Sequence, residues 1–139
     1  MTSQNEQSAR GLAARRAAET LLQTLGGATV VVRVPGGINQ ASDAAEMGAA
    51  SIMVEDVTIH PVVVRTLHGV SNTGRGQKQL IFSAASLIRA REIYSASEAV
   101  DFFTTAIGVL LEDKLLRVEG VESDEFGGVP YLYRVVVGE

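Results

Sequence analysis

The chain has 139 residues, the length of one ordinary domain and enough to enclose one hydrophobic core. Hydrophobic residues make up 46% of the sequence and charged residues 20%, a balance that excludes an intrinsically disordered chain. Cysteine and tryptophan are absent, which excludes disulfides, zinc–thiolate centres and a cysteine nucleophile. Aromatic residues make up only 5%, too few for a surface that stacks nucleic-acid bases.

The net charge of −4 is concentrated at the C-terminal end. Residues 1–111 carry nine acidic and nine basic residues, whereas residues 112–139 carry seven acidic and three basic ones. An acidic surface repels nucleic acid. No apolar run approaches the length of a membrane span, and Met1–Glu6 is too polar for a signal peptide. We therefore expect a soluble cytoplasmic protein that does not contact a membrane.

An amphipathic helix is predicted at residues 8–25, and Gly26–Gly27 ends it. A strand is predicted at residues 28–34, because β-branched residues dominate this segment. Residues 38–50 show no clear period and fit a single helical turn or a long loop equally well. The apolar stripe of the helix consists of Ala14, Ala18, Leu21, Leu22 and Leu25.

Residues 52–67 predict a further strand-rich segment. Pro61 within it predicts an edge position or a bulge near His60–Pro61, because proline has no N–H to donate to a sheet. Residues 68–78 are polar and rich in glycine, and they predict the longest loop. The strand pattern returns over residues 79–93, although Ser86–Glu92 fit a helix equally well.

A second, shorter helix is predicted to begin at Ser95. Ser95 and Glu98 have the spacing of a capping box, in which each side chain accepts a hydrogen bond from the other residue's backbone N–H. Gly108 is expected to end this helix. Its predicted buried stripe consists of Ala99, Val100, Phe103, Ala106 and Ile107.

The C-terminal part predicts a meander of strands at residues 109–111, 115–121 and 130–137, with a tight turn at Glu112–Asp113 and an acidic turn that ends in Gly127–Gly128. The last strand is apolar on both faces. We expect one face of such a strand to pack on the protein's own core and the other face to be covered by a neighbour.

The predicted fold class is therefore α+β and mainly β. Residues 1–139 form a single domain, in which a β-rich core over residues 28–137 follows the N-terminal helix. The core is expected to be a small β-barrel or sandwich-like sheet with one short helix.

Each candidate catalytic or metal-binding motif in the sequence lacks a residue or a spacing that its chemistry requires. Gly69–Gly76 nearly fits a phosphate-binding loop, but Arg75 stands where a lysine is needed and Gly76 where a hydroxyl is needed. His60 and His68 would lie roughly 26 Å apart on an extended strand, too far to share a metal. Glu55–Asp56 would point to opposite faces of a strand. We expect no catalytic residues, no cofactor and no metal, and hence no enzyme.

Candidate interaction residues occur in three places. The N-terminal helix contributes Arg10, Arg15 and Arg16. These arginines could bind nucleic acid or an acidic partner, or they could form an exposed, salt-bridged face of the helix. The loop contributes Gly69, Asn72, Gly74, Arg75 and Lys78, and the last strand contributes Tyr131, Tyr133 and Arg134.

The order of these segments along the chain is similar to that of a known protein family. An N-terminal helix and a strand are followed by Val54–Arg65, Leu80–Ala85, a short helix, Gly108–Leu111 and Gly128–Val135. This pattern resembles the small neck proteins of tailed bacteriophages, the connector or stopper proteins of the head-tail junction, over most of the chain.

The resemblance implies a virion structural protein with a β-barrel-like core, assembled in the host cytoplasm into a homo-oligomeric ring at the portal vertex. Its partners would be further copies of itself, portal or adaptor proteins and tail proteins. Packaged DNA would pass through without specific binding, and loop 68–78 would project toward the channel or the next ring. A tail terminator ring, or a small ligand-binding or enzymatic β-barrel, are the alternatives.

Overall fold

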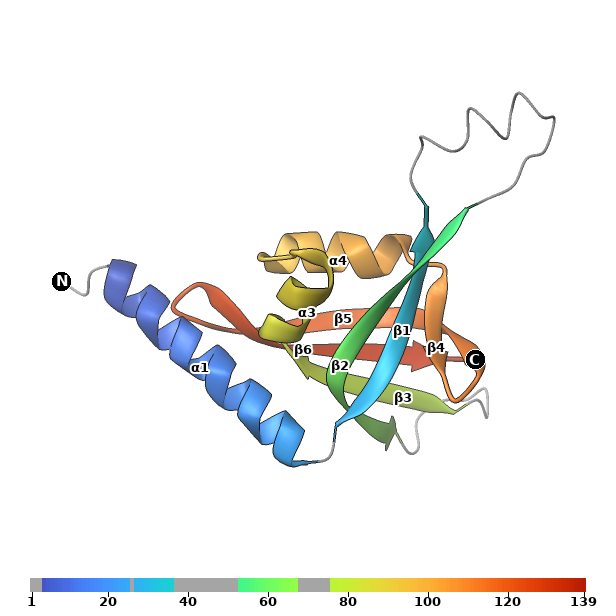
Figure 1. The fold of residues 1–139 in the computed structure, drawn as a ribbon, viewed down its shortest axis with the longest axis horizontal. Coiled ribbons are helices and arrows are strands. Elements are labelled where there is room, and N and C mark those ends of the chain that lie inside the picture. Colours follow the sequence, from blue (N-terminus) through green and yellow to red (C-terminus); the bar gives the residue numbers. More distant parts are fainter. Residues whose placement is uncertain (1–3, 26, 37–52, 68–75) are drawn as a thin grey trace, which may run out of the picture.

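The computed structural model describes residues 4–25, 27–36, 53–67 and 76–139, with side chains from residue 9 onward. In this part of the chain, six antiparallel strands close into a barrel in the order β1-β2-β3-β6-β5-β4, and helices pack around it (Figure 1). The predicted α+β, mainly β fold with a barrel is confirmed. The elements are α1 (Gln4–Thr24), β1 (Ala28–Pro35), β2 (Val54–Leu67), β3 (Gln77–Ser83), α3 (Ala84–Arg91), α4 (Ala96–Thr105), β4 (Gly108–Leu111), β5 (Lys114–Phe126) and β6 (Val129–Gly138).

Residues 38–50 lie outside the described residues, as does most of the predicted loop 68–78. Residues 79–93 divide between the two predicted alternatives, because strand β3 ends at Ser83 and helix α3 begins at the next residue.

The predicted irregularity at His60–Pro61 is confirmed as a β-bulge. Ala28 pairs with Val62 and Val30 pairs with Ile59, so β2 carries one more residue than β1 between these pairs. The His60–Pro61 peptide bond is cis. The bulge keeps Ile59 and Val62 both pointing into the core although they are three positions apart.

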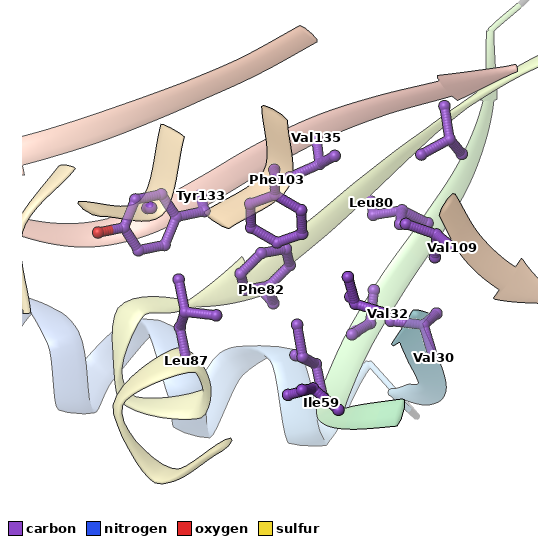
Figure 2. Packing of buried hydrophobic residues seen from close by; sticks show 14 of the residues in the cluster. Val30, Val32, Ile59, Leu80, Phe82, Leu87, Phe103, Val109, Tyr133 and Val135 are labelled. Carbon is purple, nitrogen blue, oxygen red and sulfur yellow. The ribbon is translucent and has the colours of Figure 1, made fainter. Parts of the chain in front are cut away.

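The core fills the barrel and centres on three aromatic rings (Figure 2). The ring centroid of Phe82 lies 5.8 Å from those of both Phe103 and Tyr133. Fully buried valines such as Val32 of β1 and Val109 of β4 continue the core to one side of the rings. Because β3, α4 and β6 each contribute one ring, this cluster ties the barrel to the helices.

The helix start predicted at Ser95 is confirmed, but only one half of the predicted capping box forms, because the Glu98 carboxylate accepts its hydrogen bond from the Ser95 hydroxyl and not from the Ser95 backbone N–H. The Ser95 hydroxyl accepts a hydrogen bond from the Glu98 N–H at 3.1 Å, and α4 begins directly after it. Ser83 caps α3 in the same way, with its hydroxyl oxygen 3.1 Å from the Ala85 nitrogen. Both helices therefore begin where a side chain satisfies the first backbone N–H groups.

The buried stripe predicted for the second helix is partly wrong. Ala99 and Phe103 are buried, but Val100 and Ile107 are 44% and 43% exposed. Helix α4 ends at Thr105, so Ile107 lies beyond it and does not continue its helical face.

The C-terminal meander is confirmed, and β5 is longer than predicted. It extends past Val121 to Phe126, because β6 pairs with it up to the Phe126–Val129 pair. The two hairpin turns, Glu112–Asp113 and Gly127–Gly128, have positive φ at both residues. This is the backbone twist that two-residue hairpins favour.

The burial of Tyr133 predicts a loss of stability at alkaline pH. Its side chain is 1% exposed, and burial raises the pKa of Tyr133 to about 12. Tyrosine in an unfolded chain has a pKa of about 10, so between these values the folded state holds a proton that the unfolded state has lost. We expect this group to leave stability unchanged below about pH 10 and to lower it by about 2–3 kcal/mol as the pH rises to about 12.

Ultraviolet titration of tyrosinate checks this expectation. One of the three tyrosines should ionise in a late step, and that step should vanish in Tyr133→Phe. A single common transition for all three would contradict the burial of Tyr133.

Candidate functional site

An apolar groove of about 610 Å³ lies between α1 and the outer wall of the barrel. Helix α1 runs along this side of the molecule (blue in Figure 1). It lines the groove with Ala14, Ala17, Ala18, Leu21, Leu22 and Leu25. Strands β2, β3, β5 and β6 line it with Val63, Arg65, Ile81, Phe126, Tyr131 and Leu132.

The groove exists because α1 is apolar over more of its circumference than it buries. Leu22 is only 5% exposed, whereas Leu21 and Leu25 are 61% and 63% exposed. All three belong to the apolar stripe predicted from the sequence, and only one of them is buried. Clustered apolar side chains that remain exposed mark an interaction site more often than single ones do.

The face of α1 that docks on the barrel shares only Leu22 with this apolar stripe. Gly11 lies against Val129 of β6, and the Arg15 carbonyl accepts a hydrogen bond from the Ser83 hydroxyl at 3.2 Å. Glu19 forms an ion pair with Arg89 of α3. Gly11, Arg15, Glu19 and Leu22 follow one another at helical spacing, so this mixed stripe faces inward and leaves the neighbouring apolar stripe beside the groove.

The groove carries one exposed cation. Arg65 lies on the outer face of β2, among the lining residues. It has no ion-pair partner in the described part of the chain. The Nε atom of Arg15 is buried without a hydrogen-bond partner among the described residues.

The structure separates the three arginines predicted on the N-terminal helix. Arg10 and Arg16 are exposed, whereas Arg15 is half-buried on the docked face. They therefore do not form one basic surface.

Of the predicted loop residues, Lys78 is described. It lies at the beginning of β3, with its Nζ atom 3.6 Å from a carboxylate oxygen of Glu112. Gly69, Asn72, Gly74 and Arg75 lie outside the described residues.

The three candidates on the last strand have three different environments. Tyr131 lines the groove, and Tyr133 is buried in the core. Arg134 points outward, with Nη2 2.9 Å from Asp124 Oδ1 and 3.4 Å from Glu122 Oε2. Only Tyr131 is therefore available to an occupant of the groove.

The adjacent carboxylates do not converge on one site. Glu55 lies 2.6 Å from Arg91, while Asp56 lies 3.0 Å from Arg33. The hydrogen bond from Arg33 holds the pKa of Asp56 below its ordinary value. In the described ranges, no group of three or more His, Asp or Glu side chains is placed to hold a metal ion.

Apart from Tyr131, the barrel residues of the groove were not predicted from the sequence. Val63 and Ile81 lie next to each other on the outer faces of β2 and β3, where they pair in register. The sequence does contain a signal for these outer-face residues, because Val62–Val64 and Leu80–Phe82 are unbroken apolar runs. Such runs indicate that both faces of a strand are covered.

No helix among the described residues is long and apolar enough to cross a membrane. Comparisons with protein-family models, with curated proteins and with solved structures gave no significant match.

Proposed function

We propose that this chain is a virion structural protein of the bacteriophage head-tail junction, a neck, connector or stopper subunit that assembles into a ring between the portal complex and the tail. The main observation that supports this proposal is the apolar groove. It is an apolar surface on the outside of a barrel whose own core is already filled. A protein that keeps such a surface usually covers it with another molecule.

The order of elements and the charge distribution support the choice of assembly. The chain resembles the neck proteins in its succession of helix, strands and short helices. In the acidic C-terminal hairpin, Glu122 and Asp124 both lie within ion-pair distance of Arg134. A hairpin of net negative charge suits a subunit that lets packaged DNA pass without holding it, because phosphates are repelled.

Self-association is tested by size-exclusion chromatography with light scattering over a range of protein concentrations. We expect an oligomer, and closed rings with a central opening in negatively stained electron micrographs. A monomer at the highest soluble concentration would overturn the proposal.

The position within the junction is tested by mixing the purified chain with portal and with tail assemblies encoded beside it. A neck subunit is expected to bind portal or adaptor proteins as well as tails. A tail terminator would bind tails alone. Portal, capsid and tail genes are expected next to the gene for this chain.

A small ligand-binding barrel is a second candidate, favoured by the size of the groove. Its volume of about 610 Å³ falls within the range of small-molecule pockets. Native mass spectrometry of the freshly purified protein discriminates between the two. A monomer that retains an apolar small molecule would favour this candidate over the ring.

A further inference from the structure

A second apolar surface lies on the outside of the barrel. Val31 of β1 pairs with Leu110 of β4, and Leu110 pairs with Leu115 of β5. The residues on either side of Leu110 are buried, so these three side chains point outward as one row. Leu115 is 46% exposed and lies across Gly108, where an added Cβ would come within 2.9 Å of its Cγ. We call this row the β4 patch.

The groove and the β4 patch lie on opposite sides of the barrel. The barrel side of the groove is formed mainly by β2, β3 and β6, and the patch by β5, β4 and β1. In the circular strand order these are opposite halves. A symmetric contact of groove with groove would leave both patches uncovered, whereas a contact of groove with patch covers both surfaces and can repeat from copy to copy.

Shape and charge also match. Two residues of the β4 patch, Leu110 and Leu115, lie one residue pair away from the tight Glu112–Asp113 turn, close to the tip of the β4–β5 hairpin. Asp113 has no ion-pair partner in the described part of the chain, and neither does Arg65 in the groove. The hairpin tip, which is apolar and carries the Asp113 carboxylate, is therefore complementary to the groove, which is apolar and carries the Arg65 guanidinium.

We infer that the occupant of the groove is the β4–β5 hairpin of a second copy of this chain, with Leu115 against the apolar lining and Asp113 toward Arg65. This inference rests on the proposed self-association and names its interface. A contact between two different surfaces of one chain gives a closed ring if the rotation between copies closes, and an open filament if it does not.

Glutamate substitutions on each surface test the contact. Leu21→Glu places a charge in the groove, and Leu115→Glu places one on the patch. Each is expected to raise the concentration needed for assembly by at least about tenfold, because a carboxylate would be buried in an apolar contact. Tyr94→Glu is the control, because Tyr94 is 60% exposed, like Leu21, and lies in neither surface.

An equimolar mixture of the two variants gives the sharper result. Leu115→Glu retains an intact groove and Leu21→Glu an intact hairpin, so one contact can form between them. We expect heterodimers in the mixture and monomers of each variant alone. A mixture that remains monomeric, or variants that assemble like the unaltered protein, would overturn the inference.

Cross-linking gives a measurement that does not depend on disruptive substitutions. The chain has no cysteine, so Leu21→Cys and Leu115→Cys introduce the only thiols. With a short bismaleimide, a mixture of the two variants should give covalent dimers, and the double variant a ladder of oligomers. Dimers from either variant alone, with none specific to the mixture, would instead indicate a symmetric interface.

The inference and the proposed function fail in different ways. If the unaltered protein is a monomer, self-association itself is wrong. If it assembles and the variants at Leu21 and Leu115 assemble equally well, only the assignment of the interface is wrong.

Discussion

Replacement of Phe82 by alanine is expected to lower the free energy of unfolding by about 3–5 kcal/mol. The Phe82 side chain is fully buried, and its ring lies between those of Phe103 and Tyr133. Alanine would leave a cavity that rigid strands on both sides cannot close. Because domains are stable by about 5–15 kcal/mol, this loss would remove a large part of the total. Urea denaturation followed by circular dichroism measures it.

Phe126→Ala is the matched control. It removes the same atoms from a residue that is 47% exposed. We expect a loss of about 1 kcal/mol or less, since exposed positions leave no cavity. Equal losses at the two positions would contradict the assignment of Phe82 to the core.

Replacement of Gly11 by leucine is expected to destabilise the protein by about 1–3 kcal/mol, although leucine favours helices far more than glycine does. A Cβ at Gly11 would lie 2.6 Å from the Cβ of Val129 and 2.9 Å from the carbonyl oxygen of Phe126. Neither atom belongs to a flexible side-chain end. Helix α1 would therefore have to move away from the β5–β6 hairpin.

Urea denaturation measures the loss, and hydrogen exchange shows whether protection falls first in α1. Ala13→Leu makes a similar change at an exposed position of the same helix, and its effect is expected within about 0.5 kcal/mol. A Gly11→Leu variant as stable as Ala13→Leu would mean that α1 does not dock closely at Gly11. Since α1 forms one side of the groove, assembly should weaken together with stability.

The local signals in the sequence identified most elements of the fold. The valines of β1, the capping serine of α4 and the turn residues Glu112–Asp113 act through neighbours a few positions away. The bulge at His60–Pro61 followed from the missing N–H of proline. The end of β5 was predicted too early, because its length depends on pairing with β6, which a single segment does not reveal.

The candidate site was largely outside the reach of the sequence. The sequence grouped Tyr131 and Tyr133 as interaction candidates, whereas the structure places Tyr131 in the groove and buries Tyr133 in the barrel interior. It also did not bring Val63 and Ile81 together with α1. These residues are distant in the chain, and only the pairing of β2 with β3 and the docking of α1 bring them together.

The sequence by itself determined that an N-terminal helix with an apolar stripe precedes a chain of mainly strands, because period and capping are local properties. The helix, predicted at residues 8–25, extends over Gln4–Thr24. Only the tertiary structure decided which face of that helix docks. Gly11 permits close approach, and the contacts of Arg15 and Glu19 fix the orientation on the barrel. The apolar stripe lies beside this docked face, so it lines the groove and is not buried against the barrel.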